Sequence, residues 1–282
     1  MGNETLHRLA AFTEDAAGGN PAGVWVGDAL PDADSMQRIA AEVGYSETAF
    51  ISPRSGRDRD IRYYSPEAEV PFCGHATIAS GVLLGKTVGE GSYLFSTSVG
   101  EVPVSVRQRE GRMEASLRSP ETRYELATDE LLDSALAALA WQRSELDPRI
   151  PPAQAYAGAW HLVVAVSDLA RLEDLHYDFE ALKSLMLAEN LTTLQLVWRE
   201  TDDVFHSRNP FPVGGVVEDP ATGAAAAALG GYLRDAELIV APFGFVIRQG
   251  EAMGRPSLLS VDVPASGGIN VSGTAVDIPD QL

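Results

Sequence analysis

Two stretches dominated by small and apolar residues stand out in the hydrophobic pattern of the chain. They run over residues 78–84 and 224–233, and each follows a proline-containing loop and an Ala-Thr pair, at residues 76–77 and 221–222. A helix with almost no polar face is typical of burial against other elements and not of a surface position. We therefore expect two helices, each surrounded by sheet.

The two stretches lie about half a chain apart, which favours a diverged internal duplication into two similar lobes. A chance match of this length is an equally good explanation from the pattern alone. The start of each helix would present backbone N–H groups without intrahelical partners and the positive end of a dipole, which suits a carboxylate ligand. The duplication hypothesis predicts that both helix starts point at a shared cleft.

In the rest of the chain, apolar and polar residues mostly alternate as they do in strands, and three further helices are predicted. Helices are predicted over residues 31–43, with Gly44 as the stop, over 128–141, with Thr128 as N-cap, and over 168–186, broken near 176–178. Strands are predicted over residues 6–13, 23–26, 45–51, 60–65, 92–97, 102–108, 113–117, 153–157, 161–166, 194–199, 204–208, 245–249, 257–263 and 270–276.

Many strands around few helices favour an α+β fold, because a doubly wound sheet would need more regular alternation of strand and helix. The polar segment over residues 119–125 is the best place for a domain boundary. We expect lobes over residues 1–118 and 119–282, with a last strand that can return to the first lobe.

Composition narrows the class of protein. Forty acidic residues against 21 Lys and Arg give 282 residues a formal net charge of −19, which argues against binding to nucleic acid or to an anionic membrane. No apolar run is long enough to span a bilayer. Cys73 is the single cysteine, so an internal disulfide is excluded and a reducing compartment fits. We expect a soluble cytoplasmic protein.

Three ionisable residues are candidates for chemistry, and each has a structural alternative. Glu47 lies among apolar neighbours in a predicted strand, where it is either solvated at an edge or buried as a general base or acid. His75 follows a glycine at a helix start, as a capping residue or as a proton donor or substrate ligand. Asp219 precedes the second buried helix, as an N-cap or as a substrate contact.

Cofactor and metal motifs are missing from the sequence. Residues 81–87 mimic a phosphate-binding loop, but one residue is missing between the glycines and the segment ends a helix instead of starting one. No dinucleotide fingerprint follows a strand, the five histidines lack metal-ligand spacing, and no serine nucleophile motif occurs. The remaining expectation is acid–base chemistry with no cofactor and no metal.

Several motifs together resemble one known family. They are Phe12-Thr13 with residues 19–24, the Ser46–Phe50 segment, residues 69–77 with Cys73-Gly74-His75, Glu218–Gly223, and residues 249–257. In this order they are similar to the PhzF-like (phenazine biosynthesis) isomerase/epimerase family, and they run from residue 12 to about residue 276.

The resemblance implies a diaminopimelate-epimerase-like fold: two pseudo-symmetric lobes, each a barrel-like, mostly antiparallel sheet around a central helix. It also implies a homodimer and a cofactor-free site in the cleft between the lobes, acting on a small carboxylate. Glu47 would shuttle a proton between carbons of a cyclic or dienyl amino acid, with His75 and Asp219 contacting the substrate. The implied substrate-binding residues are Asn20, Ser46, Gly74, Ala76, Thr222, Gly223 and Ala224.

The chain departs from the family pattern at one position, and two alternative functions remain open. The family commonly has serine where this chain has Ala224, so a hydroxyl that could hold the substrate carboxylate is missing. The phenazine precursor is therefore doubtful as substrate, while the acid–base residues are intact. The alternatives are an amino-acid epimerase with Glu47 and Asp219 as opposed bases, and a non-catalytic binding protein. A two-thiol mechanism is excluded, because Cys73 is the only cysteine.

Overall fold

The computed structural model describes residues 4–279, and the fold is a mixed α+β fold. Contacts between residues divide the chain into two compact units. The first unit holds residues 4–118 together with 272–279, and the second is Ser119–Val271. Within the described residues, no helix is both long and apolar enough to cross a membrane.

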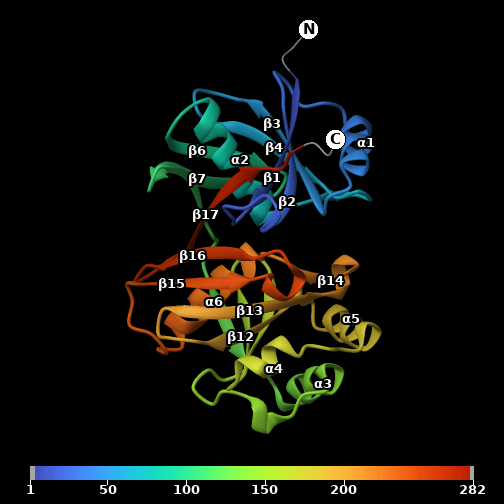
Figure 1. The fold of residues 1–282 in the computed structure, drawn as a ribbon, viewed down its shortest axis with the longest axis vertical. Helices are drawn as coiled ribbons and strands as arrows, with labels where there is room; N and C mark the ends of the chain where they lie inside the picture. The colour runs from blue at the N-terminus through green and yellow to red at the C-terminus, as the bar shows by residue number, and fades with distance from the viewer. Residues whose placement is uncertain (1–3, 280–282) are drawn as a thin grey trace. The chain divides into compact units, whose positions relative to one another are not determined.

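The first unit is a closed barrel of eight strands. Consecutive hydrogen-bonded neighbours are β1, β2, β3, β4, β6, β7, β8 and β17, and β17 pairs back onto β1. Their bounds are β1 Thr5–Ala11, β2 Asn20–Val26, β3 Glu47–Pro53, β4 Arg59–Tyr64, β6 Gly91–Thr97, β7 Gly100–Arg109, β8 Arg112–Arg118 and β17 Asn270–Asp277. A two-residue strand, β5 (Glu69–Val70), pairs antiparallel with the end of β4. Figure 1 shows red β17 beside blue β1, so the end of the chain completes the barrel formed by its beginning.

The barrel of the first unit is filled by helix α2 (Gly74–Thr87). Every residue from His75 to Gly85 is buried, and the helix packs against β1, β2, β3, β7 and β8. Small residues allow this close fit: a Cβ added at Gly81 would lie 2.8 Å from the Cβ of Ala115 on β8. The predicted buried helix over residues 78–84 is therefore confirmed.

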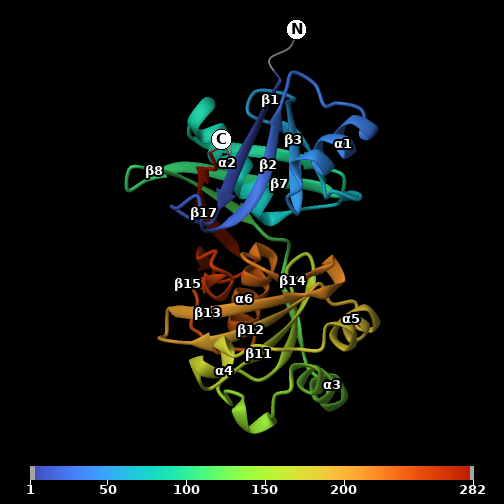
Figure 2. The same cartoon turned by 45° about the vertical axis from the view of Figure 1, so that its right-hand side comes forward.

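The second unit wraps a curved sheet around a second buried helix. Its strands are β9 Arg123–Leu126, β10 Ala153–Tyr156, β11 Trp160–Ala165, β12 Thr193–Arg199, β13 Val204–Phe211, β14 Val216–Asp219, β15 Phe243–Gln249 and β16 Ser257–Val263. They pair in the order β9, β10, β11, β12, β13, β15, β16, with β14 also on β13. Helix α6 (Gly223–Asp235) packs against β9 to β12 and β16, and Figure 2 shows it within the second unit.

The same series of connections occurs in both units. In the first, β2 and β3 are parallel across a helical crossover, β4 is antiparallel to β3, and β4 is parallel to β6 across α2. In the second, β11 and β12 are parallel across a helical crossover, β13 is antiparallel to β12, and β13 is parallel to β15 across α6. The fold therefore consists of two lobes of like topology, as the repeated sequence pattern predicts.

The Ala-Thr pairs are less equivalent than the sequence pattern suggests. Ala76-Thr77 lies inside the first turn of α2, whereas Ala221-Thr222 precedes α6, with Thr222 as its N-cap. The repeat therefore has an offset of four residues at the helix starts. The lobes share an architecture but not a residue-by-residue register at this point.

Four outer helices begin with a side-chain cap. They are α1 Ala33–Val43, α3 Asp129–Leu139, α4 Leu169–Glu173 and α5 Phe179–Ala188, with Asp32, Thr128, Asp168 and Asp178 as capping residues. The predicted stop of the first helix is confirmed, because Gly44 adopts a left-handed conformation with φ 71°. Three short 3₁₀ helices, η1 Arg143–Glu145, η2 Pro212–Gly214 and η3 Glu251–Met253, complete the elements of the described chain.

Candidate active site

In the first unit, Glu47 and His75 form a close acid–base pair. Glu47 is the first residue of β3, which runs between β2 and β4, so the side chain is not at a sheet edge. Its Oε2 lies 3.4 Å from Nε2 of His75 in the first turn of α2. The Glu47 side chain is 18% exposed and that of His75 is 6% exposed. A shielded carboxylate held against an imidazole can accept and return a proton in a fixed direction.

Ser46 and Cys73 complete the surroundings of the imidazole. The hydroxyl Oγ of Ser46 lies 3.5 Å from His75 Nε2, and the thiol Sγ of Cys73 lies 3.4 Å from His75 Nδ1. Both ring nitrogens of His75 therefore face polar groups. Cys73 is the N-cap residue of α2 and is buried.

The start of α2 is fixed by a buried chain of hydroxyl groups. The Thr77 hydroxyl donates to the carbonyl of Cys73 at 2.6 Å, and the Tyr63 hydroxyl lies 2.7 Å from Thr77 Oγ1. Burial raises the pKa of Tyr63 far above its ordinary value, so its hydroxyl stays neutral. This anchoring holds Cys73 and His75 in place relative to β4.

The other predicted contacts of the first unit lie at the same ends of their elements. Gly74 is the half-buried first residue of α2, and Ala76 is fully buried in its first turn. Asn20 is buried at the start of β2, two residues before Ala22, which pairs with Glu47. The strand starts of β2 and β3 therefore bring Asn20 towards the Glu47 end of the barrel.

In the second unit, Asp219 is tied to the start of α6. Its Oδ2 accepts a 2.6 Å hydrogen bond from the hydroxyl of Thr222. The N-cap of α6 is Thr222 and not Asp219, so the alternative of Asp219 as a simple cap is wrong. Asp219 is half-buried at the end of β14, where its carboxylate remains near the helix start.

Gln249 at the end of β15 fixes this loop from the side. Its amide donates to the backbone carbonyl of Asp219 at 2.8 Å and to Oγ1 of Thr222 at 3.0 Å, and its Oε1 accepts from the backbone N–H of Thr222 at 3.2 Å. The residue is 1% exposed. The sequence motif that contains Gln249 indicates the family, but nothing in its local pattern indicates these contacts.

The two central helices differ from the outer ones at their N-termini. The N-cap side chains of α2 and α6, Cys73 and Thr222, make no capping hydrogen bond, whereas the caps of α1, α3, α4 and α5 all do. Gly223 is buried and Ala224 half-buried in the first turn of α6. Backbone N–H groups at such a terminus suit an anionic ligand.

The topological counterpart of Glu47 in the second unit is Thr193. It is the first residue of β12 and pairs with His161, as Glu47 begins β3 and pairs with Ala22. Thr193 is buried and accepts from Asn209, and its hydroxyl lies 2.8 Å from Nδ1 of His161. Burial lowers the pKa of His161 to about 3, so this pair is a neutral structural contact.

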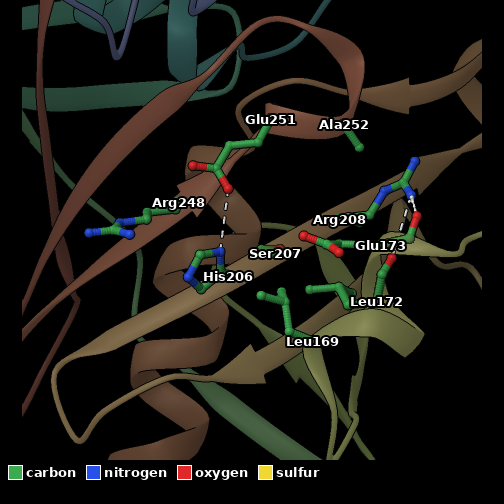
Figure 3. Close-up of a pocket in the computed structure, with 9 residues that line it drawn as sticks. All are labelled: Leu169, Leu172, Glu173, His206, Ser207, Arg208, Arg248, Glu251 and Ala252. Atoms are coloured by element: carbon green, nitrogen blue, oxygen red, sulfur yellow. Dashed lines mark hydrogen bonds and ion pairs between the residues drawn. The ribbon is translucent and has the colours of Figure 1, made fainter.

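A separate hollow of about 310 Å³ lies on the second unit, between α4, β13 and η3 (Figure 3). None of the predicted site residues lines it. Several of its charged groups pair with neighbouring side chains: His206 contacts Glu200 at 2.9 Å and Glu251 at 3.4 Å, and Arg208 binds Glu218 at 2.6 Å.

Comparison with known proteins places the chain in a family. A family model described as phenazine biosynthesis-like protein matches residues 9–280. The uncharacterized isomerase YfhB of Bacillus subtilis is 30% identical over 283 residues, which cover 95% of this chain and 94% of that protein. The trans-2,3-dihydro-3-hydroxyanthranilate isomerase of Pseudomonas aeruginosa is 31% identical over 282 residues, covering 95% and 96%.

The fold agrees with these relatives. The crystal structure of a PhzF-family phenazine biosynthesis protein from Bacillus anthracis matches with a TM-score of 0.85 at 24% identity, covering 97% of this chain and 96% of that one. The family match extends over nearly all of the sequence and includes the segments that carry Glu47, His75 and Asp219. The chain therefore belongs to the phenazine biosynthesis-like protein family and is an isomerase.

Proposed function

We propose that the chain moves a proton between two carbons of a small, amino-acid-like carboxylate without a cofactor. The observation that carries this proposal is the shielded pair of Glu47 and His75, whose Oε2 and Nε2 atoms lie 3.4 Å apart. Carbon acids are weak, so a base must be positioned and shielded from water to remove their protons. Glu47 is positioned by its contact with His75, and its side chain is largely but not fully shielded, with 18% exposed.

Glu47 acts as base and then as acid. Its carboxylate takes a proton from one carbon, and the electron pair of the broken C–H bond delocalises into the conjugated system of the substrate. The protonated Glu47 then returns that proton to another carbon on the same face, and a new C–H bond forms. One carboxylate is enough for this sequence, and the enzyme ends in its starting protonation state.

The helix N-termini stabilise the charge of the substrate. In this proposal the backbone N–H groups of Gly74 and Ala76 in α2, with those of Gly223 and Ala224 at α6, bind the substrate carboxylate and the delocalised charge. The missing side-chain caps of α2 and α6 support this role, because a capping side chain would compete with the ligand.

Side chains around these termini orient the substrate. His75 and Asp219 contact its amino or hydroxyl groups, and Asn20 and Ser46 add hydrogen bonds. The bond from Thr222 and the bridge from Gln249 support the role of Asp219, because both restrict its position. We further propose that the enzyme works as a cytoplasmic homodimer, as the family resemblance implies.

The substrate class follows from the same groups. A cyclic or dienyl amino acid offers an acidic C–H bond, a conjugated system and a carboxylate. One relative is named for trans-2,3-dihydro-3-hydroxyanthranilate, which makes this compound the first to test. Ala224 supplies no hydroxyl at the first turn of α6, so we propose that the preferred substrate holds its carboxylate by backbone N–H groups alone.

A single base fits the chain better than two symmetric bases. The counterpart of Glu47 in the second unit is Thr193, whose hydroxyl cannot act as a base at neutral pH and is already hydrogen-bonded. Asp219, the alternative second base, belongs to a different structural position and accepts a bond from Thr222. These contacts favour a transfer on one face over epimerisation by opposed bases.

The test is label transfer in a panel of cyclic and dienyl amino acids, followed by NMR. A substrate deuterated at the donor carbon is incubated in ordinary water. A single shuttling carboxylate delivers a measurable fraction of the deuterium to the acceptor carbon of the product. Complete loss of label to water with inversion at one carbon would instead support two opposed bases, and no exchange in any compound would contradict the proposed chemistry.

A further inference from the structure

Three side chains with metal-binding atoms meet at the start of α2. Glu47, Cys73 and His75 each offer one atom, a carboxylate oxygen, a thiol sulfur and an imidazole nitrogen, and these atoms all lie within 4.8 Å of one another. Within residues 4–279 this is the one such group of three. Because Glu47 lies 26 residues before Cys73 in the sequence, only the fold brings the three together.

The spacing of the three atoms resembles that of ligands on a tetrahedral ion. Zinc bonds of about 2.0 Å to nitrogen and oxygen and 2.3 Å to sulfur place neighbouring ligand atoms about 3.3 to 3.6 Å apart. His75 Nε2 lies 3.4 Å from Glu47 Oε2 and 3.8 Å from Cys73 Sγ. The remaining pair, the Glu47 oxygen and Cys73 Sγ, lies within 4.8 Å, so closing the site around one ion requires side-chain shifts of up to about 1 Å.

Hydrogen bonds within the protein already hold the backbone of Cys73 in place. Thr77 holds the carbonyl of Cys73 through its hydroxyl, at 2.6 Å, and through its backbone N–H, at 3.1 Å. Cys73 is 7% and His75 6% exposed, whereas the Glu47 side chain is 18% exposed. An ion would therefore be shielded on the helix side and open to solvent on the carboxylate side.

We propose that Glu47, Cys73 and His75 form a binding site for a borderline-soft divalent cation, with Zn²⁺ as the physiological type. Thiolate, imidazole and carboxylate are the three ligand classes that Zn²⁺ takes in proteins, and three protein ligands leave a fourth position open to water or an anion. On binding, the Cys73 thiol releases its proton to solvent, and the S–H bond is replaced by a sulfur–metal bond.

Occupancy of this site blocks catalysis, a consequence that rests on the proposed function. The ion takes the lone pairs of Glu47 and His75 that proton transfer requires. Micromolar Zn²⁺ is then a reversible inhibitor, and a chelator restores the activity. The site would make the isomerase responsive to the supply of free zinc.

The experiment measures metal binding to the full chain without any substrate. Chelator-treated protein is titrated with Co²⁺, whose visible spectrum reports thiolate ligation and tetrahedral geometry, and then with Zn²⁺ in competition. We expect one equivalent to bind, with a sulfur-to-cobalt charge-transfer band. Cys73→Ser removes the band, and His75→Asn weakens binding by at least about 100-fold. Loss of a group that only hydrogen-bonds to a metal ligand already lowers metal affinity by about 10- to 100-fold, and loss of the ligand itself costs at least as much.

His176→Asn is the matched control, since the His176 side chain is 92% exposed and pairs only loosely with Asp174 at 3.5 Å. It should bind Co²⁺ like the unaltered chain. If Cys73→Ser binds Co²⁺ as tightly as the unaltered protein, or if the bound ion shows no sulfur band, the proposed site is wrong.

A second measurement needs no substitution in the site. Cys73 is the only cysteine of the chain, so the reaction of a thiol reagent reports this residue alone. Zn²⁺ should slow alkylation of the unaltered protein at least about tenfold, whereas Mg²⁺, a poor thiolate partner, should not. Equal alkylation rates with and without Zn²⁺ would overturn the inference. A site that binds zinc in a protein without isomerase activity would refute only the proposed function.

Discussion

Replacement of Gln249 by methionine tests how firmly the Asp219 loop is held. The amide of Gln249 makes three hydrogen bonds, to the carbonyl of Asp219 and to the hydroxyl and N–H of Thr222, and it is 1% exposed. A hydrogen bond contributes about 0.5–1.5 kcal/mol net, and methionine fills a similar volume without replacing any of them. We expect Gln249→Met to lower the free energy of unfolding by about 2–4 kcal/mol.

The assay is equilibrium unfolding in urea followed by tryptophan fluorescence. Trp141, Trp160 and Trp198 lie in the second unit and only Trp25 lies in the first, so the signal mainly reports the unit that carries Gln249. The midpoint should fall while the slope m stays constant, since the surface exposed on unfolding is unchanged.

The control is the same substitution at an exposed site. Gln108→Met on β7 should change the free energy of unfolding by less than about 0.5 kcal/mol. Gln249→Met should also speed amide exchange in the first turn of α6, where the Ala226 N–H donates to the carbonyl of Thr222. A loss below about 0.5 kcal/mol with unchanged exchange would refute the bridging role of Gln249.

Three further substitutions test the interiors of the units. Burial holds the pKa of His161 at about 3, against 6.5 in an unfolded chain, so stability is lost as the pH falls from about 6.5 towards 3, by up to about 1.4 kcal/mol per pH unit. His161→Leu should therefore reduce the difference in unfolding free energy between pH 7 and pH 5, measured in urea. An unchanged difference between the two pH values would contradict this role of His161. Gly81→Ala should lower stability by about 1 kcal/mol despite the better helix propensity of alanine, because the new Cβ lies 2.8 Å from that of Ala115; a raised melting temperature would show that the helix has room. Glu218→Gln should cost about 3–5 kcal/mol, because the charge of Arg208 loses its buried partner; a loss under about 1 kcal/mol in urea would mean that solvent screens this pair.

Helix ends are the features that local sequence chemistry predicts best. Gly44 ends α1 in a left-handed conformation, and Thr128 caps α3 by accepting from the N–H of Leu131. The burial of α2 and α6 was also predictable, because neither has a polar face. Each of these features depends on residues within a few positions of one another.

Elements whose position depends on residues far away in the sequence could not be predicted in the same way. The sequence pattern does not predict β9, because Arg123–Leu126 is mostly exposed and is placed by pairing with β10. The pattern does not predict the offset of the Ala-Thr pairs for a related reason: the helix start depends on how each loop packs. Sequence similarity preserves the pair but not its place in the turn.

The same distinction applies to the candidate site, whose residues are identified by sequence motifs but whose distances depend on the fold. Family motifs identify Glu47, His75 and Asp219, but the 3.4 Å approach of Glu47 to His75 depends on the arrangement of β3, β4 and α2. The bridge from Gln249 crosses 27 residues to Thr222. The proposed metal site could not be predicted from the sequence, because Cys73 and His75 meet Glu47 only in the fold.

The most direct test of the central claim is the rate of carbon-to-carbon proton transfer in Glu47→Gln, with Glu42→Gln on the exposed face of α1 as the control. Both are measured by NMR on whichever cyclic or dienyl amino acid the unaltered enzyme converts. Glutamine keeps the size of the side chain and removes the base, so Glu47→Gln should lose about 10²- to 10⁴-fold in rate while Glu42→Gln keeps the full rate. A Glu47→Gln rate within about threefold of the unaltered enzyme would show that another group moves the proton.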